Sequence, residues 1–214
     1  MTQAILAIEL STPTGQLAVV RDGTVLFESA FTSNRSHNSM LYAPLGEALA
    51  AAGDTLGLIV VGTGPGSYTG VRIGIAAAYG VALSRNVPVM GWSSLTALSP
   101  LQDYHVAGDA RRGKFYTGQV SQGRMTGPLI LHDEAGLRTW HAASDGRPCF
   151  TSDAVVPLGL PGIELAQPSA VLLAKLAAGL DALEREGLTA VEIEPVYITE
   201  AFITQAKKKQ ALPP

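Results

Sequence analysis

The sequence has little cysteine and no long apolar run. Cys149 is the only cysteine among 214 residues, which excludes a disulfide framework and a multi-cysteine metal site. No apolar stretch reaches the roughly 20 residues of a membrane span. The start, Met1-Thr2-Gln3, lacks the basic residues that open a signal peptide. We therefore expect a cytoplasmic protein with no membrane segment.

Charge is also scarce. Charged residues make up 15% of the chain and hydrophobic residues 47%, whereas soluble domains average roughly 25% charged residues. A surface with so few charges is expected to be covered in part by another subunit. The net charge of −3 gives no support for free-standing nucleic-acid binding. Residues Lys207–Lys209 lie in a C-terminal stretch that we expect to be a disordered tail, 206–214.

Several catalytic patterns are missing. No Gly-x-Ser-x-Gly segment occurs, so a serine nucleophile elbow is not expected. The four histidines are scattered through the chain, and none has the spacing of a helical metal pair. No Gly-Gly pair occurs either, although actin-like ATPases usually build an adenosine wall from one. No metal site is predicted.

A glycine-rich turn, Gly62–Gly74, organises the first half of the chain. It follows an apolar run at 58–61 and precedes a nearly uncharged helical pattern at 75–83. A P-loop would need glycine where Thr69 stands, and a dinucleotide fingerprint would need it at Ser67 or Thr69. Such a turn can hold an anion at the helix start. The favoured interpretation is that the glycines allow a tight turn and close packing of the helix that follows.

The element pattern predicts an α/β fold. Strands are expected at 4–10, 16–20 and 24–31, then a helix at 40–52 kinked at Pro44, a strand at 58–61, a helix at 75–83, a strand at 87–91 and a helix from Ser93. This order is that of the ribonuclease-H-like half of the actin-like ATPase architecture. Strand-like segments at 104–110 and 113–120 begin the same strand order again, and one helix is expected at 169–186. We predict two lobes with mixed sheets flanked by helices: residues 1–100, and a smaller, reduced lobe, residues 101–205.

Two carboxylates could face each other between these lobes. Glu9 and Asp109 end the first strands of the two halves, and a facing pair could hold Mg²⁺ on a nucleotide. Ser11 and Thr12 in the following turn complete this candidate nucleotide site. The alternative, favoured by the missing Gly-Gly turn, is that both acids are ordinary turn carboxylates.

A basic hairpin is expected at 109–114. Arg111, Arg112 and Lys114 form a local cluster of positive charge there. The cluster could touch phosphate or RNA, and a plain solvated hairpin explains it at least as well. The sequence does not decide between the two.

Four segments together resemble the TsaB family, also called YeaZ: Ile8–Thr12, Gly62–Gly74, Gly91–Leu95 and Asp109–Tyr116. The resemblance runs from about residue 4 to 120, and Pro195–Ile198 resembles the family's C-terminal end. It implies a role in making threonylcarbamoyladenosine next to the anticodon of ANN-decoding tRNAs. It also implies a non-catalytic relative of the transferase TsaD. The metal-binding histidine stretch of TsaD is replaced here by residues 93–98, which contain no histidine, and Glu9 stands where the family usually has Asp.

The resemblance also implies partners. They are TsaD, the ATPase TsaE and, without TsaD, a second copy of the chain in a homodimer; tRNA is reached only indirectly, through the complex. No cofactor is required, although weak ATP or ADP binding is left open. The helices near 40–52 and 75–83 are apolar on more than one face, which suits a partner surface. The predicted interface residues are Met40, Leu41, Tyr42, Leu45, Tyr68, Val71, Arg72, Ile75 and Tyr79. The alternative function is an ATP-binding enzyme of the actin-like superfamily that uses Glu9 and Asp109.

Overall fold

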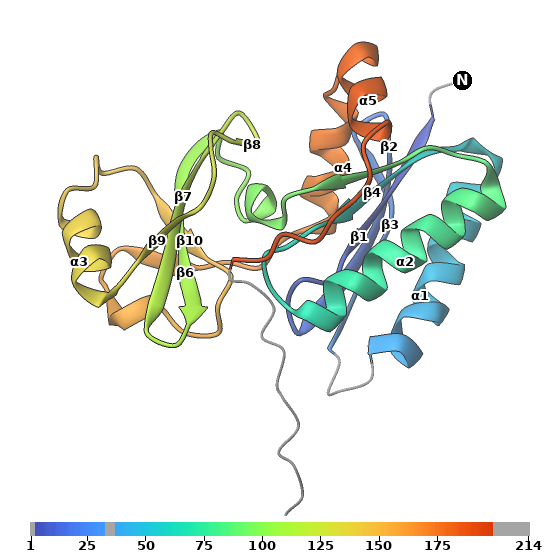
Figure 1. The fold of residues 1–214 in the computed structure, drawn as a ribbon. Helices are drawn as coiled ribbons and strands as arrows, with labels where there is room; N and C mark the ends of the chain where they lie inside the picture. Colours follow the sequence, from blue (N-terminus) through green and yellow to red (C-terminus); the bar gives the residue numbers. More distant parts are fainter. Residues whose placement is uncertain (1–2, 33–36, 199–214) are drawn as a thin grey trace, which may run out of the picture.

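The computed structural model of the protein describes residues 3–32 and 37–198, and of residues 37–39 the backbone only. Two lobes lie side by side, each built on one mixed sheet (Figure 1). The predicted tail at 206–214 lies outside the described residues. No helix within the described ranges is both long and apolar enough to cross a membrane.

The first sheet has the strand order β3-β2-β1-β4-β5. Its strands are β1 (Ala4–Glu9), β2 (Thr14–Arg21), β3 (Thr24–Thr32), β4 (Leu56–Gly62) and β5 (Val89–Trp92). The first three strands form an antiparallel meander, turned at the predicted hairpin Asp22-Gly23, and β4 and β5 run parallel to β1. This is the predicted ribonuclease-H-like order.

Helices cover both faces of the first sheet. On one face lie α1 (His37–Ala52), which contains Pro44, and α2 (Tyr68–Arg85). On the other lies α4 (Ala170–Ala178), followed by α5 (Ala182–Thr189). Side chains of β1 alternate between the two faces, Leu6 and Ile8 toward α1 and α2, Ile5 and Ala7 toward α4. The sheet is therefore buried on both sides, which explains the nearly continuous apolar run of β1.

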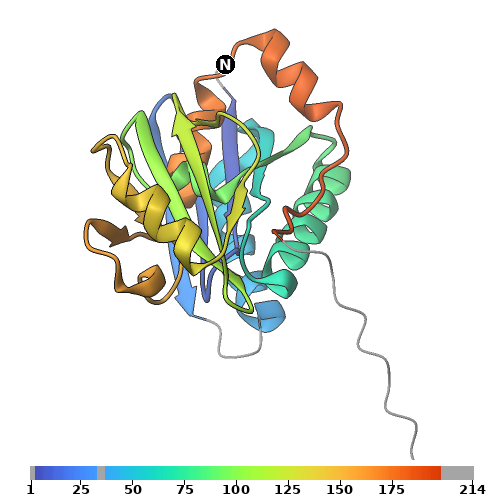
Figure 2. The same ribbon diagram turned by 60° about the vertical axis from the view of Figure 1, so that its left-hand side comes forward.

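The second sheet repeats the first in reduced form. Its strands are β6 (Asp103–Arg111), β7 (Lys114–Ser121), β8 (Arg124–Met125), β9 (Ile130–His132), β10 (Cys149–Thr151) and β11 (Ile163–Leu165). A meander again leads to two strands parallel to the central one, β10 and β11. The short α3 (Glu134–Ala142) corresponds in order to α1 and lies in front of this sheet in Figure 2. Only a 3₁₀ turn at Pro157–Gly159 stands in the place of α2.

Three expectations are corrected. The helix expected from Ser93 is a single 3₁₀ turn, Ser94–Ala97. The expected helix at 169–186 is two helices, because the chain breaks at Gly179 and Asp181 caps a new start through a capping box with Glu184. The described part of the predicted lobe at 101–205 is divided between the two sheets. Residues 103–165 form the second sheet, but α4 returns to the first sheet because its apolar face fills the core there.

Candidate functional site

The glycine-rich turn brings the start of α2 against the end of β1. A Cβ on Gly66 would overlap the Ser11 carbonyl, and one on Gly70 would overlap the Leu10 carbonyl. Ser67 caps α2 through its Oγ, which accepts from the Gly70 N–H at 3.1 Å, and its own N–H donates to Ser11. The glycines thus serve close packing inside the chain. The structure gives this turn the packing role and engages these N–H groups internally, which argues against an open anion site.

Glu9 is wholly enclosed at the end of β1. Its Oε1 accepts from the Ser11 N–H at 2.6 Å, while Oε2 has no hydrogen-bond partner within the described chain. Gly62 makes room for this carboxyl, because a Cβ there would overlap Oε2. Burial raises the pKa of Glu9, and the bond from Ser11 opposes that rise only in part. An acid held in this way favours its neutral form.

The other residues of the candidate nucleotide site do not assemble an open site with Glu9. Ser11 and Thr12 are buried, and the Thr12 hydroxyl donates to the Thr14 carbonyl at 3.0 Å. Asp109 lies on the second sheet, partly exposed, and its carboxylate accepts from the Arg111 N–H at 2.7 Å. Glu9 is fully buried, so it offers no surface to a ligand beside Asp109 in this structure.

The outer side of α1 and α2, here called the α1–α2 face, exposes several large side chains. Tyr42 is 68% exposed, Met40 47%, Tyr68 48% and Tyr79 39%. Two hollows flank α2, of about 550 Å³ on one side and about 500 Å³ on the other. Ala76 lines both hollows. The small side chain of Ala76 therefore separates two depressions, one lined by Tyr79 and the other by Tyr42.

Four of the nine predicted interface residues are core residues. Leu41, Leu45, Val71 and Ile75 are at least 92% buried in the cluster that joins α1 and α2 to the first sheet. The apolar periodicity of the two helices reports this internal packing, so these four residues have little surface left for a partner. The other five predicted residues are exposed: Met40, Tyr42, Tyr68, Arg72 and Tyr79.

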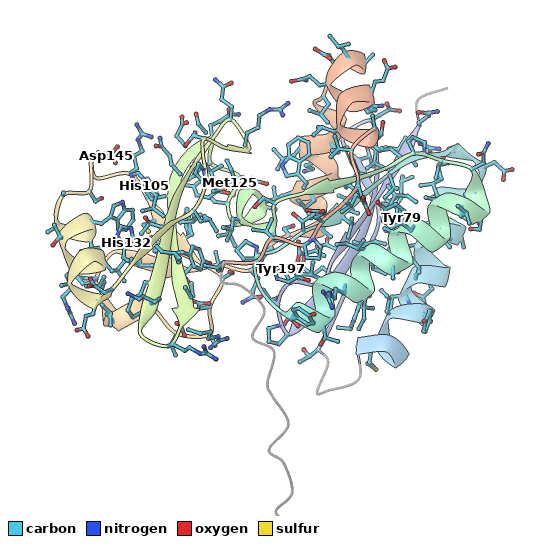
Figure 3. The ribbon with its side chains drawn as sticks, in the orientation of Figure 1. Tyr79, His105, Met125, His132, Asp145 and Tyr197 are labelled. Carbon is cyan, nitrogen blue, oxygen red and sulfur yellow. The ribbon has the colours of Figure 1, made fainter. Side chains whose placement is uncertain are left out.

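The C-terminal strap, residues 193–197, forms one edge of this face. It runs from α5 down along α2 (Figure 2), and Figure 3 shows Tyr79 and Tyr197 at its two ends. The Ile193 N–H donates to Tyr79 Oη at 3.1 Å, and the Val196 N–H donates to the Thr63 carbonyl at 2.8 Å. These bonds fix the strap to α2 and to the glycine-rich turn. It forms one wall of the larger hollow.

Three side chains close the lower end of the strap. Arg72 Nε donates to Tyr197 Oη at 2.8 Å, and the Arg72 guanidinium lies 3.9 Å from the centre of the Tyr68 ring. The Tyr68 and Tyr197 rings are 5.4 Å apart. Sequence reasoning expected Tyr68 and Arg72 at an interface but not this internal use of them. The only signal of the strap was the extended segment Pro195–Ile198.

Comparison with known proteins shows which proteins this chain is similar to. A family model described as TsaD, tRNA N6-adenosine threonylcarbamoyltransferase, matches residues 27–132. The tRNA threonylcarbamoyladenosine biosynthesis protein TsaB of Haemophilus influenzae is 28% identical over 229 residues, covering 91% of this chain and 92% of the relative. The Bacillus subtilis protein of the same name is 39% identical over 124 residues, 53% of each chain. The chain belongs to the TsaB family.

A solved structure supports the TsaB assignment at the level of the fold. A Pseudomonas aeruginosa protein described as similar to peptidase YEAZ matches with a TM-score of 0.68 and 25% identity, covering 92% of this chain and all of the other. The match extends over both lobes. The predicted actin-like, two-lobed α/β architecture is confirmed.

The histidines of this TsaB-family chain have structural roles where their side chains are described. His105 Nε2 lies 2.9 Å from Asp145 Oδ1 and His132 Nε2 lies 2.8 Å from Thr117 Oγ1 (Figure 3). His141 bonds the Pro161 carbonyl at 2.8 Å. Cys149 is buried, which raises the pKa of its thiol to about 12. Within the described ranges, no three His, Cys, Asp or Glu side chains gather as a metal site would require.

Proposed function

We propose that this chain is a non-catalytic docking subunit for threonylcarbamoyladenosine synthesis on tRNA in the cytoplasm. It binds TsaD through the α1–α2 face, with TsaE as a third member of the complex. When TsaD is absent, two copies of the chain pair through the same face. Neither catalysis nor a bound cofactor is required of the chain in this role.

The pair of hollows on either side of Ala76 is the observation that carries the proposal. Gly80 lies inside α2, lines the smaller hollow and is exposed, and a Cβ there would meet no atom of the chain within 4 Å. A glycine inside a helix costs about 0.5–1 kcal/mol relative to alanine, and the described chain offers no internal reason for it. Close approach of another chain would supply that reason.

Kinship between the partners also supports the proposal. The TsaD family model matches residues 27–132, a range that contains both α1 and α2. TsaD is therefore expected to carry counterparts of these helices. Related chains that pair through corresponding surfaces form near-symmetric interfaces, in which each side offers ridges to the grooves of the other. A tyrosine-edged face with two hollows suits such packing.

The test is to mix the purified chain with TsaD and to follow the mass of the complex by light scattering. The informative variant is Ala76→Glu, because Ala76 is exposed and lines both hollows. Its glutamate would leave the fold intact but would be buried without a partner in the complex. Ile75→Glu would not serve, because Ile75 is a core residue and its replacement would damage the fold itself.

Ala135→Glu on α3 is the matched control, since it makes the same change at an exposed helical position of the other lobe. We expect wild type and Ala135→Glu to form a complex with TsaD, and Ala76→Glu to lose it by at least tenfold in affinity. Loss of threonylcarbamoyl transfer to tRNA should follow the loss of the complex. If wild type does not bind TsaD, or if Ala76→Glu binds as well as the control, the proposal is wrong.

A further inference from the structure

The hairpin between β6 and β7 presents a concentration of positive charge. Arg111, Arg112 and Lys114 surround Gly113 at its tip, and all three are exposed, with the Arg111 side chain 82% exposed. The chain as a whole has a net charge of −3. Attraction for a polyanion must therefore come from a local feature of this kind.

The backbone of the tip is held in a conformation that arginine disfavours. Arg111 has φ 73° and Arg112 has φ 56°, so two consecutive non-glycine residues are left-handed. In the β2–β3 turn, the position that corresponds to Arg112 is occupied by Asp22. Aspartate tolerates the left-handed backbone region well. Residues held in a sparsely populated backbone region are energetically disfavoured and cluster at functional sites. Asparagine at position 112 would suit the turn better.

Neighbouring carboxylates brace the tip. Asp153 accepts from the Asp109 N–H at 2.6 Å, and Asp109 in turn accepts from the Arg111 N–H at 2.7 Å. Both acids are thus bound to backbone amides. The contact between Asp109 and the Arg111 guanidinium is long, 3.4 Å, and is exposed to solvent. The carboxylates therefore brace the loop, and the contact with Asp109 leaves most of the Arg111 side chain exposed.

Other arginines of the second lobe are paired more closely. Arg138 meets Glu134 at 2.9 Å, Arg147 meets Asp145 at 2.9 Å and Arg124 meets Glu184 at 2.6 Å. Each of these pairs lies in or beside the second lobe. Arg111, in contrast, extends from a rigid turn with its guanidinium largely open to solvent.

We propose that the hairpin at residues 109–114 binds backbone phosphates of structured RNA. Arginine forks match phosphate geometry, and a braced loop loses little entropy on binding. RNA is chosen over an acidic protein because the proposed function places the chain in a complex that modifies tRNA, and to that extent the inference rests on the proposed function. It goes beyond that function, because tRNA is then contacted directly rather than only through the partners.

The experiment measures binding of a fluorescently labelled tRNA transcript to the full chain by anisotropy, from 50 to 200 mM salt. The test variant is Arg111→Gln/Arg112→Asn/Lys114→Gln. The control is Arg85→Gln/Arg138→Gln/Lys175→Gln, which removes the same number of exposed cations of the same kinds elsewhere. Thermal melts check that both variants fold, and we expect Arg112→Asn alone to leave the melting temperature unchanged or raised.

Wild type and control should bind with affinities within threefold of each other, and the test variant should bind at least tenfold more weakly. The slope of log K against log salt should fall in magnitude by about two to three for the test variant, because three phosphate-contacting cations are removed. Equal binding by the two triple variants, or no binding by wild type at 50 mM salt, would overturn the inference. Weakened binding to TsaD with unchanged tRNA binding would instead point to an acidic protein surface. The light-scattering experiment with Ala76→Glu tests the docking function separately.

Discussion

Glu9 is a carboxylic acid enclosed at the end of β1, and its surroundings favour the neutral form. Burial raises its pKa, and one of its oxygens has no partner in the described chain. Folding raises the pKa of this acid, so at high pH the unfolded chain, in which the acid ionises freely in water, becomes more favourable relative to the folded one. The free energy of unfolding should therefore fall as pH rises above the ordinary pKa of glutamate.

We predict that Glu9→Gln removes this part of the pH dependence. The amide keeps an oxygen to accept from the Ser11 N–H and carries no charge at any pH. At pH 8 the variant should be more stable than wild type, and at pH 4.5 the two should differ little. Thermal melts of both proteins at the two pH values check this. Parallel pH profiles would show that Glu9 is not the titrating group.

Gly80 provides a second residue-scale prediction. Gly80→Ala should raise the stability of the isolated chain by about 0.5–1 kcal/mol, because alanine favours the helix and its Cβ meets no atom. The same methyl group should weaken binding to TsaD if a partner approaches α2 closely at this point. Melting temperature and light scattering measure the two effects.

Gly187→Ala in α5 is the matched control, because a Cβ at Gly187 also meets nothing. It should not lower stability, and it should leave TsaD binding unchanged. If Gly80→Ala binds TsaD as well as Gly187→Ala does, close approach at Gly80 is wrong.

At the scale of single elements, the strap is held by few bonds. The amides of Ile193 and Val196 donate to Tyr79 Oη and to the Thr63 carbonyl, and Tyr197 fastens the lower end against Arg72 and Tyr68. Such a segment should open without unfolding the sheet. It lies beside the α1–α2 face, so its opening would change one wall of the larger hollow.

We predict that Tyr197→Ala speeds hydrogen exchange at the Val196 amide by tenfold or more. The hydrogen exchange of the β1 and β4 amides should not change, since these strands lie in the buried centre of the first sheet. Hydrogen exchange followed by mass spectrometry or NMR gives both quantities. Uniformly faster exchange would mean that Tyr197 supports the whole fold rather than the strap alone.

The sequence predicted elements well where local signals were strong. Asp22-Gly23 correctly predicted a hairpin, and the apolar runs of β1 and β4 correctly predicted central strands. It failed where tertiary contacts decide. Within 169–186 the apolar spacing continued across Gly179, but the capping box of Asp181 and Glu184 starts a new helix there. The helix α3, with only Leu137 buried, has too short an apolar pattern to stand out among polar residues.

The candidate site was predicted only in part, for a physical reason. Periodic apolar side chains mark a helix face that is buried, but they do not tell whether the chain itself or a partner buries it. Leu41 and Ile75 face the chain's own sheet, whereas Tyr42 and Tyr79 are open. The strap escaped notice because its bonds to Tyr79 and Thr63 join residues far apart in the sequence.

At the scale of the whole molecule, the two lobes follow one strand order but differ in their helices. The first lobe has α2 between its two parallel strands, and the second has only a 3₁₀ turn at Pro157–Gly159 in that place. In the first lobe, the side chain of Glu9 at the end of β1 is fully buried. An actin-like ATPase needs open carboxylates at its strand ends to hold the metal on a nucleotide, and here one of the two expected acids is enclosed.

We therefore predict that the chain does not bind ATP with magnesium at millimolar concentration. Isothermal titration of the purified chain with ATP and with ADP checks this, with TsaE as a positive control for the nucleotide. The alternative function makes the opposite demand, since binding must be present and must be lost in Asp109→Ala. Binding that survives Asp109→Ala but is lost in Glu9→Gln would show that the buried carboxyl becomes exposed in solution. That result would reopen the strand ends of the first lobe as a ligand site, while the α1–α2 face would still be tested by its own variants.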